Sequence, residues 1–326
     1  MIRSSLRAVA LCVSVGVIVG ASGRGVPLGL DLYRPAPGAN PLTPAKIALG
    51  RRLFHERRLS FNASLSCAGC HDPRRAFTNA HSRARGANGV VGNRNVPTLV
   101  NRAWGSSYFW DGRALTLEQQ ALGPLLNANE LAGTPDGVVA LARSSDYRQQ
   151  FLAAFGDEPD LFDVAAALAS YVRTIMSGDA PVDRFLAGDR RALGEAARRG
   201  LVLFRAKAHC STCHAGPLFS DEQFHNTGVA WRTGILTDVG RYQVTRASAD
   251  RAAFKTPTLR EISRTAPYMH DGSSATLDAV VDFYDAGGGR NAGLDPEIRP
   301  LNLSTAEKKD LIAFLGSLTG RIREGT

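Results

Sequence analysis

The sequence predicts a mainly α-helical protein built from two similar units, with long loops and little or no β-sheet. Three observations support this fold class. Several segments combine helical apolar spacing with helix caps, no convincing run of alternating strand residues occurs, and one long stretch of the chain is repeated. At 326 residues, 44% of them hydrophobic and 21% charged, the chain is long enough for two domains with separate cores.

The first element along the chain is an apolar N-terminal segment. Arg3 and Arg7 precede an apolar run over residues 8–19, and small residues follow at 20–23. This order is typical of a secretory signal peptide over residues 1–23, and the run is too short to span a bilayer well. We therefore expect export to the periplasm and a mature protein that is not an integral membrane protein.

The net charge of the chain indicates which classes of binding partner it could attract. Lys and Arg number 39 against 30 Asp and Glu, which gives a formal net charge of +9. A basic surface can steer acidic protein partners. Basic and aromatic residues are not interleaved as in nucleic-acid-binding proteins, and export argues against that function, so we expect no nucleic-acid partner.

Local signals predict three helices with defined ends. Thr43 is a good N-cap for a helix over residues 44–54, which begins with Pro. An apolar, Ala-rich pattern predicts a helix over residues 161–175 that ends by Gly178. Residues 304–307, Ser-Thr-Ala-Glu, form a capping box for a C-terminal helix.

A Cys-x-x-Cys-His motif occurs twice, as CAGCH at residues 67–71 and CSTCH at residues 210–214. Disulfides, a redox-active Cys pair and a zinc site are alternatives. None of them requires a His after the second Cys. Covalent c-type haem does, because the two thiols form thioether bonds to the haem and the adjacent His binds its iron. Export also agrees with haem attachment. We predict two haems, held by Cys67, Cys70 and His71 and by Cys210, Cys213 and His214.

The repeat extends beyond these motifs. Residues 95–117 (NVPTLVNRAWGSSYFWDGRALTL) align without a gap with residues 255–277 (KTPTLREISRTAPYMHDGSSATL). Such agreement predicts two copies of one haem-binding unit. We expect an N-terminal haem domain over residues 24–178 and a C-terminal haem domain over residues 179–326.

The two haem sites are not equivalent. Tyr284 lies 14 residues after His270, and the same count from Trp110 reaches Pro124. A Tyr phenolate can bind haem iron, whereas Pro has no ligand atom in its side chain. If this position faces iron in both units, the second haem is closed and the first is open to a small molecule such as peroxide. This asymmetry favours an enzyme over a simple electron carrier.

The chain resembles the bacterial di-haem cytochrome c peroxidases and their relative MauG from about residue 40 to residue 320. The motifs that carry the resemblance are LGRRLFHERRLS, both CxxCH sites, RNVPTLVN, FWDGRALTLEQQALGPLLN, FHNTGV and TAPYMHDG. The resemblance implies reduction of hydrogen peroxide to water with electrons from a small c-type cytochrome or cupredoxin. The alternatives are MauG-like oxidation of a partner protein's side chains and, less favoured, non-enzymatic electron transfer. The resemblance is also compatible with a homodimer.

The resemblance assigns residues to the open site. It implies that peroxide binds at the His71 haem, beside Gln120 and Glu130, and that Trp110 lies between the haems to relay electrons. A Glu is suited to moving a proton between the two peroxide oxygens, whereas a Gln can only orient them. Many family members also carry a distal His in the loop after the first motif, and His81 is the only His there, in a sequence context that fits poorly.

The resemblance also implies two further ligand sets. A calcium ion between the haems would be bound by the side chain of Asn95 and the backbone carbonyls of Thr265 and Pro267, since calcium prefers oxygen ligands. The sixth ligand of the His214 haem is Met in typical peroxidases and Tyr in MauG, which predicts Tyr284. Met269 is the alternative, with His270 also within reach.

Overall fold

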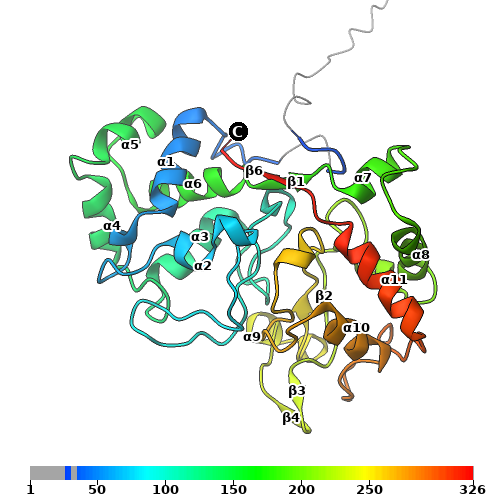
Figure 1. Ribbon diagram of the computed structural model, residues 1–326. Helices are drawn as coiled ribbons and strands as arrows, with labels where there is room; N and C mark the ends of the chain where they lie inside the picture. Colours follow the sequence, from blue (N-terminus) through cyan, green and yellow to red (C-terminus); the bar gives the residue numbers. More distant parts are fainter. Residues whose placement is uncertain (1–25, 31–34, 326) are drawn as a thin grey trace, which may run out of the picture.

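The computed structural model describes residues 26–30 and 35–325, so the predicted signal peptide lies outside the described residues (Figure 1). The fold is rich in helices: α1 (Pro44–Phe54), α2 (Cys67–Cys70), α3 (Leu117–Leu126), α4 (Pro135–Ala142), α5 (Arg148–Phe155), α6 (Leu161–Val172), α7 (Pro181–Leu186), α8 (Glu195–Arg205), α9 (Tyr242–Thr245), α10 (Leu277–Asp285) and α11 (Thr305–Gly316). Within the described ranges, no helix is long and apolar enough to cross a membrane.

The strands are short and form three two-stranded antiparallel sheets. They pair as β1 (Met176–Gly178) with β6 (Arg321–Arg323), β2 (Phe224–His225) with β5 (Phe254–Lys255), and β3 (Trp231–Arg232) with β4 (Ile235–Leu236). The prediction of a mainly α protein with little β-sheet is therefore confirmed.

Two of the three predicted helices form as expected. The Thr43 side chain accepts a hydrogen bond from the backbone N–H of Lys46 at the start of α1. At the start of α11, Ser304 and Glu307 make both hydrogen bonds of the capping box. These caps satisfy N–H groups that the first helical turn leaves unpaired, which is why so local a signal locates a helix start.

The prediction for residues 161–175 is wrong at its C-terminal end. Helix α6 stops at Val172, and Met176 lies in the buried strand β1 opposite Arg323, not in a helix. The side chain of Asn101 holds this strand, because it accepts from the N–H of Ser177 and donates to its carbonyl, at 2.8 and 2.9 Å. Partners distant in sequence therefore override the local helical pattern.

The same helix packing occurs in each half of the molecule. Helix α1 packs on α6 in one half, and α8 packs on α11 in the other (Figure 1). Each crossing has a glycine where the backbones approach closely. A Cβ atom on Gly50 would lie 1.9 Å from the carbonyl oxygen of Ala167, and one on Gly200 would lie 2.0 Å from that of Asp310. Only glycine allows either approach. The buried residues of one large apolar cluster all precede Gly178 in the sequence, and those of the other all follow it.

The repeated sequence also adopts the same local structure twice. Tyr108 donates its backbone N–H to Ala114 at 2.8 Å, and the aligned Tyr268 donates to Ser274 at 2.7 Å. Helices α3 and α10 start at aligned residues, with the hydroxyls of Thr116 and Thr276 as caps. The gap-free alignment is thus a structural alignment, and aligned residues can be compared directly.

Candidate functional site

One large cavity connects the two copies of the motif. Its volume is about 1390 Å³, above the ~300–1,000 Å³ of a typical small-molecule site. Apart from His81, every residue that sequence reasoning placed in the site lines it: Cys67, Cys70, His71, Asn95, Trp110, Gln120, Glu130, Cys210, Cys213, His214, Thr265, Pro267, Met269, His270 and Tyr284. Both motifs therefore open into the same space, which is wide enough for large cofactors.

The His of each motif is prepared to bind a metal. Nδ1 of His71 lies 2.9 Å from the carbonyl oxygen of Phe77, and Nδ1 of His214 lies 2.8 Å from that of Phe219. A carbonyl can only accept, so each Nδ1 carries the hydrogen and each Nε2 keeps a free lone pair. Burial lowers the pKa of both His residues, which favours the neutral form that a ligand requires.

The thiols do not suit the alternative uses of a Cys pair. All four described cysteines are unpaired, so disulfides are not formed. Burial raises the pKa of Cys67 to about 12, that of Cys70 to about 11 and that of Cys210 to about 12, whereas redox-active thiols have a lowered pKa. No close group of His, Cys and acidic side chains among the described residues combines both Cys pairs, as a shared zinc site would need.

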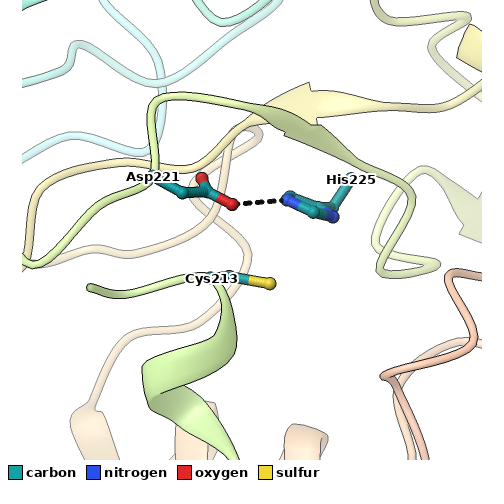
Figure 2. A group of neighbouring side chains, drawn as sticks. All are labelled: Cys213, Asp221 and His225. Carbon is teal, nitrogen blue, oxygen red and sulfur yellow. Dashed lines mark hydrogen bonds and ion pairs between the residues drawn. The ribbon is translucent and has the colours of Figure 1, made fainter.

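The second motif is braced by residues to which the sequence alone assigned no role. Figure 2 shows His225 hydrogen-bonded to Asp221, with Cys213 beside them. Nε2 of His225 lies 2.9 Å from Asp221, and its Nδ1 lies 2.6 Å from Asp295. His225 belongs to FHNTGV, one of the motifs quoted above, but nothing local in that motif identifies its acidic partners. These contacts hold the loop that follows His214.

On the first copy's side of the cavity, α3 presents Gln120 and Pro124 one turn apart. Glu130 follows in the turn after this helix, where its carboxylate accepts a hydrogen bond from Asn127 Nδ2 at 2.8 Å. Burial raises the pKa of Glu130, although this hydrogen bond and the charge of Arg113 oppose the shift. The cavity that His71 lines thus also carries a carboxyl group that keeps its proton to a higher pH than an ordinary glutamate does.

On the second copy's side, Tyr284 occupies the position in α10 that aligns with Pro124 in α3. Burial and the adjacent Cys210 and Cys213 raise the pKa of Tyr284 to about 12, and a hydrogen bond with Thr227 opposes the shift. Tyr284, Cys210 and Cys213 all line the cavity. The alternative candidate His270 is packed in an aromatic stack, 3.6 Å from the Phe254 ring centroid.

Trp110 lies where the two copies meet. Its Nε1 donates to the carbonyl of Asn95 at 2.8 Å, and its ring lies edge-on to His270 at 6.4 Å between centroids. The Asn95 side chain donates to the carbonyls of His81 and Ser82, at 3.2 Å each, which leaves its Oδ1 available to a cation. His81 is exposed and does not line the cavity.

The chain is similar to several known proteins along most of its length. Residues 44–191 match the family model of the di-haem cytochrome c peroxidases. The chain is 42% identical to the methylamine utilization protein MauG of Methylorubrum extorquens over 287 residues, 87% of this chain and 81% of the relative. It is 36% identical to the cytochrome-c peroxidase IdrP1 of Denitromonas iodatirespirans, over 98% and 93% of the two chains. A crystal structure of a MauG-like protein associated with microbial copper homeostasis superposes with a TM-score of 0.82 at 34% identity, covering 89% and 95%.

Proposed function

The chain belongs to the family of di-haem cytochrome c peroxidases and MauG, and from this membership we propose which of its residues perform each part of a peroxidase reaction. The protein is a peroxidase-type oxidoreductase, and its family implies two c-type haems. Each haem, when bound, supplies a redox-active iron.

We assign haem attachment to the two motifs, with His71 and His214 as the proximal ligands. The hydrogen bond from each Nδ1 to a backbone carbonyl supports this assignment, because it orients the ring and leaves Nε2 free. The separate apolar clusters on either side of Gly178 support an N-terminal haem domain (24–178) and a C-terminal one (179–326).

The peroxide site is assigned to the N-terminal copy. The observation that carries this assignment is that Pro124 and Tyr284 occupy equivalent positions in the two copies and both line the cavity, and of the two only Tyr284 offers a ligand atom. Near His71, Gln120 orients the peroxide by hydrogen bonding. Glu130 accepts a proton from one peroxide oxygen and returns it to the other, which makes the second oxygen a better leaving group.

Electrons reach the peroxide site through the contact between the copies. The Trp110 indole lies there, tied by hydrogen bonding to Asn95 and close to His270, and is positioned to relay an electron. In the periplasm a small c-type cytochrome or cupredoxin would supply the electrons. The alternative function is MauG-like oxidation of a partner protein's side chain, which Tyr284 favours. Rapid turnover with a reduced small donor supports the first function, and a long-lived oxidised state that attacks a protein supports the second.

The first test of the proposal is the mass of the exported protein. Mass spectrometry is expected to show two haem additions and no free thiol, and the purified protein is expected to consume peroxide only with a reduced donor. A mass equal to the bare polypeptide, or four cysteines open to alkylation, would exclude haem attachment and with it the proposed roles.

The calcium site leads to a second prediction. We propose that Asn95 Oδ1 and the carbonyls of Thr265 and Pro267 bind one calcium ion, which stabilises the folded state because unfolded chains lack the site. A chelator should lower the melting temperature of the wild type, and Asn95→Ala should bind no calcium and not respond to the chelator. Asn93→Ala, an exposed neighbour in the same loop, is the control. Equal calcium content in wild type and Asn95→Ala would refute the assignment.

A further inference from the structure

The repeat places a lysine in the second copy where the first copy has the proposed calcium ligand. Lys255 aligns with Asn95, and Ser107 aligns with Pro267. The backbones correspond as well, because the N–H of Asn95 donates to the carbonyl of His270 at 2.7 Å and that of Lys255 donates to the carbonyl of Trp110 at 2.8 Å. The same backbone position therefore carries the neutral amide of Asn95 in the first copy and the ammonium group of Lys255 in the second.

Lys255 and Arg102 are two cations held next to the same carboxylate, that of Glu222, and Asp221 is a further negative charge near Lys255. Lys255 is only 6% exposed and forms an ion pair with the buried Glu222. Arg102 contacts the same carboxylate through Nη1, at 3.2 Å from Oε1, and its side chain is 12% exposed. Among the described residues, Glu222 is thus the one carboxylate in direct ion-pair contact with either cation, and both cations share it.

Several buried donors in this cluster also lack an acceptor. Nε and Nη2 of Arg102 and the hydroxyl of Ser107 have no hydrogen-bond partner among the described residues, and Lys255 Nζ has none beyond its ion pair. Folded proteins rarely leave such groups unsatisfied. All three side chains line the large cavity. Burial and the charge of Arg102 lower the pKa of Lys255 to about 7, although the charge of Asp221 opposes the shift.

We propose that Arg102, Ser107 and Lys255 bind a carboxylate group of a haem in this cavity, next to Trp110. The inference rests on the proposed function, because it requires a haem to be present. The proposal also explains why Lys255 replaces Asn95 in the repeat. In the second copy the lysine carries the positive charge, and in the first copy the proposed calcium ion carries it. A free oxyanion such as phosphate has the same chemistry, but the site opens into the space that both haem-attachment motifs line.

The test uses the full-length protein with both haems attached. Lys255→Met removes the charge and keeps the length of the side chain. A positive charge near a haem disfavours the oxidised iron, so its removal should lower the midpoint potential of one haem. The resonance Raman bending bands of the haem carboxylates should shift in the same variant. Lys255→Arg should keep the wild-type potential, and Lys309→Met should change neither property.

Ser107→Ala is a milder second variant that preserves the charges, and it should shift the same Raman bands if Lys255→Met does not fold. Unchanged carboxylate bands in both variants would overturn the proposal. If phosphate raises the melting temperature of the wild type but not of Lys255→Met, and the bands stay unchanged, the anion is free and not part of haem. Absence of haem in the wild-type mass is a failure of the proposed function and is measured beforehand.

Discussion

Replacing Glu130 with Gln is expected to slow peroxide turnover by about 10²–10⁴-fold while both haems stay attached, because one positioned acid–base group is typically worth that much. The variant keeps the shape of the side chain, and its amide oxygen can still accept the hydrogen bond from Asn127. What it loses is the ability to hold the proton between the two peroxide oxygens. The loss should therefore appear in the rate of reaction with peroxide and not in protein folding.

Stopped-flow measurement of the reaction with peroxide, over a range of pH, checks this prediction. Burial raises the pKa of Glu130, so the wild-type rate should fall as the pH drops through a value above the usual range of a glutamate, because the protonated carboxyl cannot accept a proton. Glu130→Gln should lack this dependence. Glu195→Gln, an exposed residue at the start of α8, is the control. Near-normal turnover in Glu130→Gln with intact haems would make Glu130 a structural residue.

The features predicted well from sequence are those specified by a few neighbouring residues. Helix α1 begins after Thr43 and α11 after Ser304, because each cap is formed within a single turn. The gap-free repeat also had to bring Pro124 and Tyr284 to the same face of α3 and α10, since both helices start at aligned residues. The residue count along the repeat was therefore enough to predict that both side chains occupy equivalent positions, and both line the cavity.

The features that sequence reasoning missed depend on partners far apart in the chain. Strand β1 exists because β6, near the end of the chain, pairs with it. His225 contacts an acidic residue four positions before it and another far beyond it. The cluster of Arg102, Glu222 and Lys255 draws on three separate segments, each of which resembles an ordinary solvated charge when examined alone.

Replacing Tyr284 with Phe is expected to change the spectrum of the second haem and leave that of the first unchanged. The substitution removes the proposed ligand atom but preserves the ring that α10 presents to the cavity, which Cys210 and Cys213 also line. With no phenolate, the iron bound by His214 should become high-spin or take Met269 or His270 as its ligand. A phenolate favours oxidised iron, so its loss should also raise the midpoint potential of this haem.

Electron paramagnetic resonance of the fully oxidised protein distinguishes these outcomes, because it reports the spin state of each iron. Tyr268→Phe is a matched control, since it removes a hydroxyl that donates to the Ile262 carbonyl at 3.0 Å in the same copy. Its spectrum should equal that of the wild type. An unchanged spectrum in Tyr284→Phe would exclude Tyr284 as the ligand and leave Met269 or His270 in its place. The MauG-like alternative would then lose its main support, because a Met ligand belongs to the peroxidases that take electrons from a small donor protein.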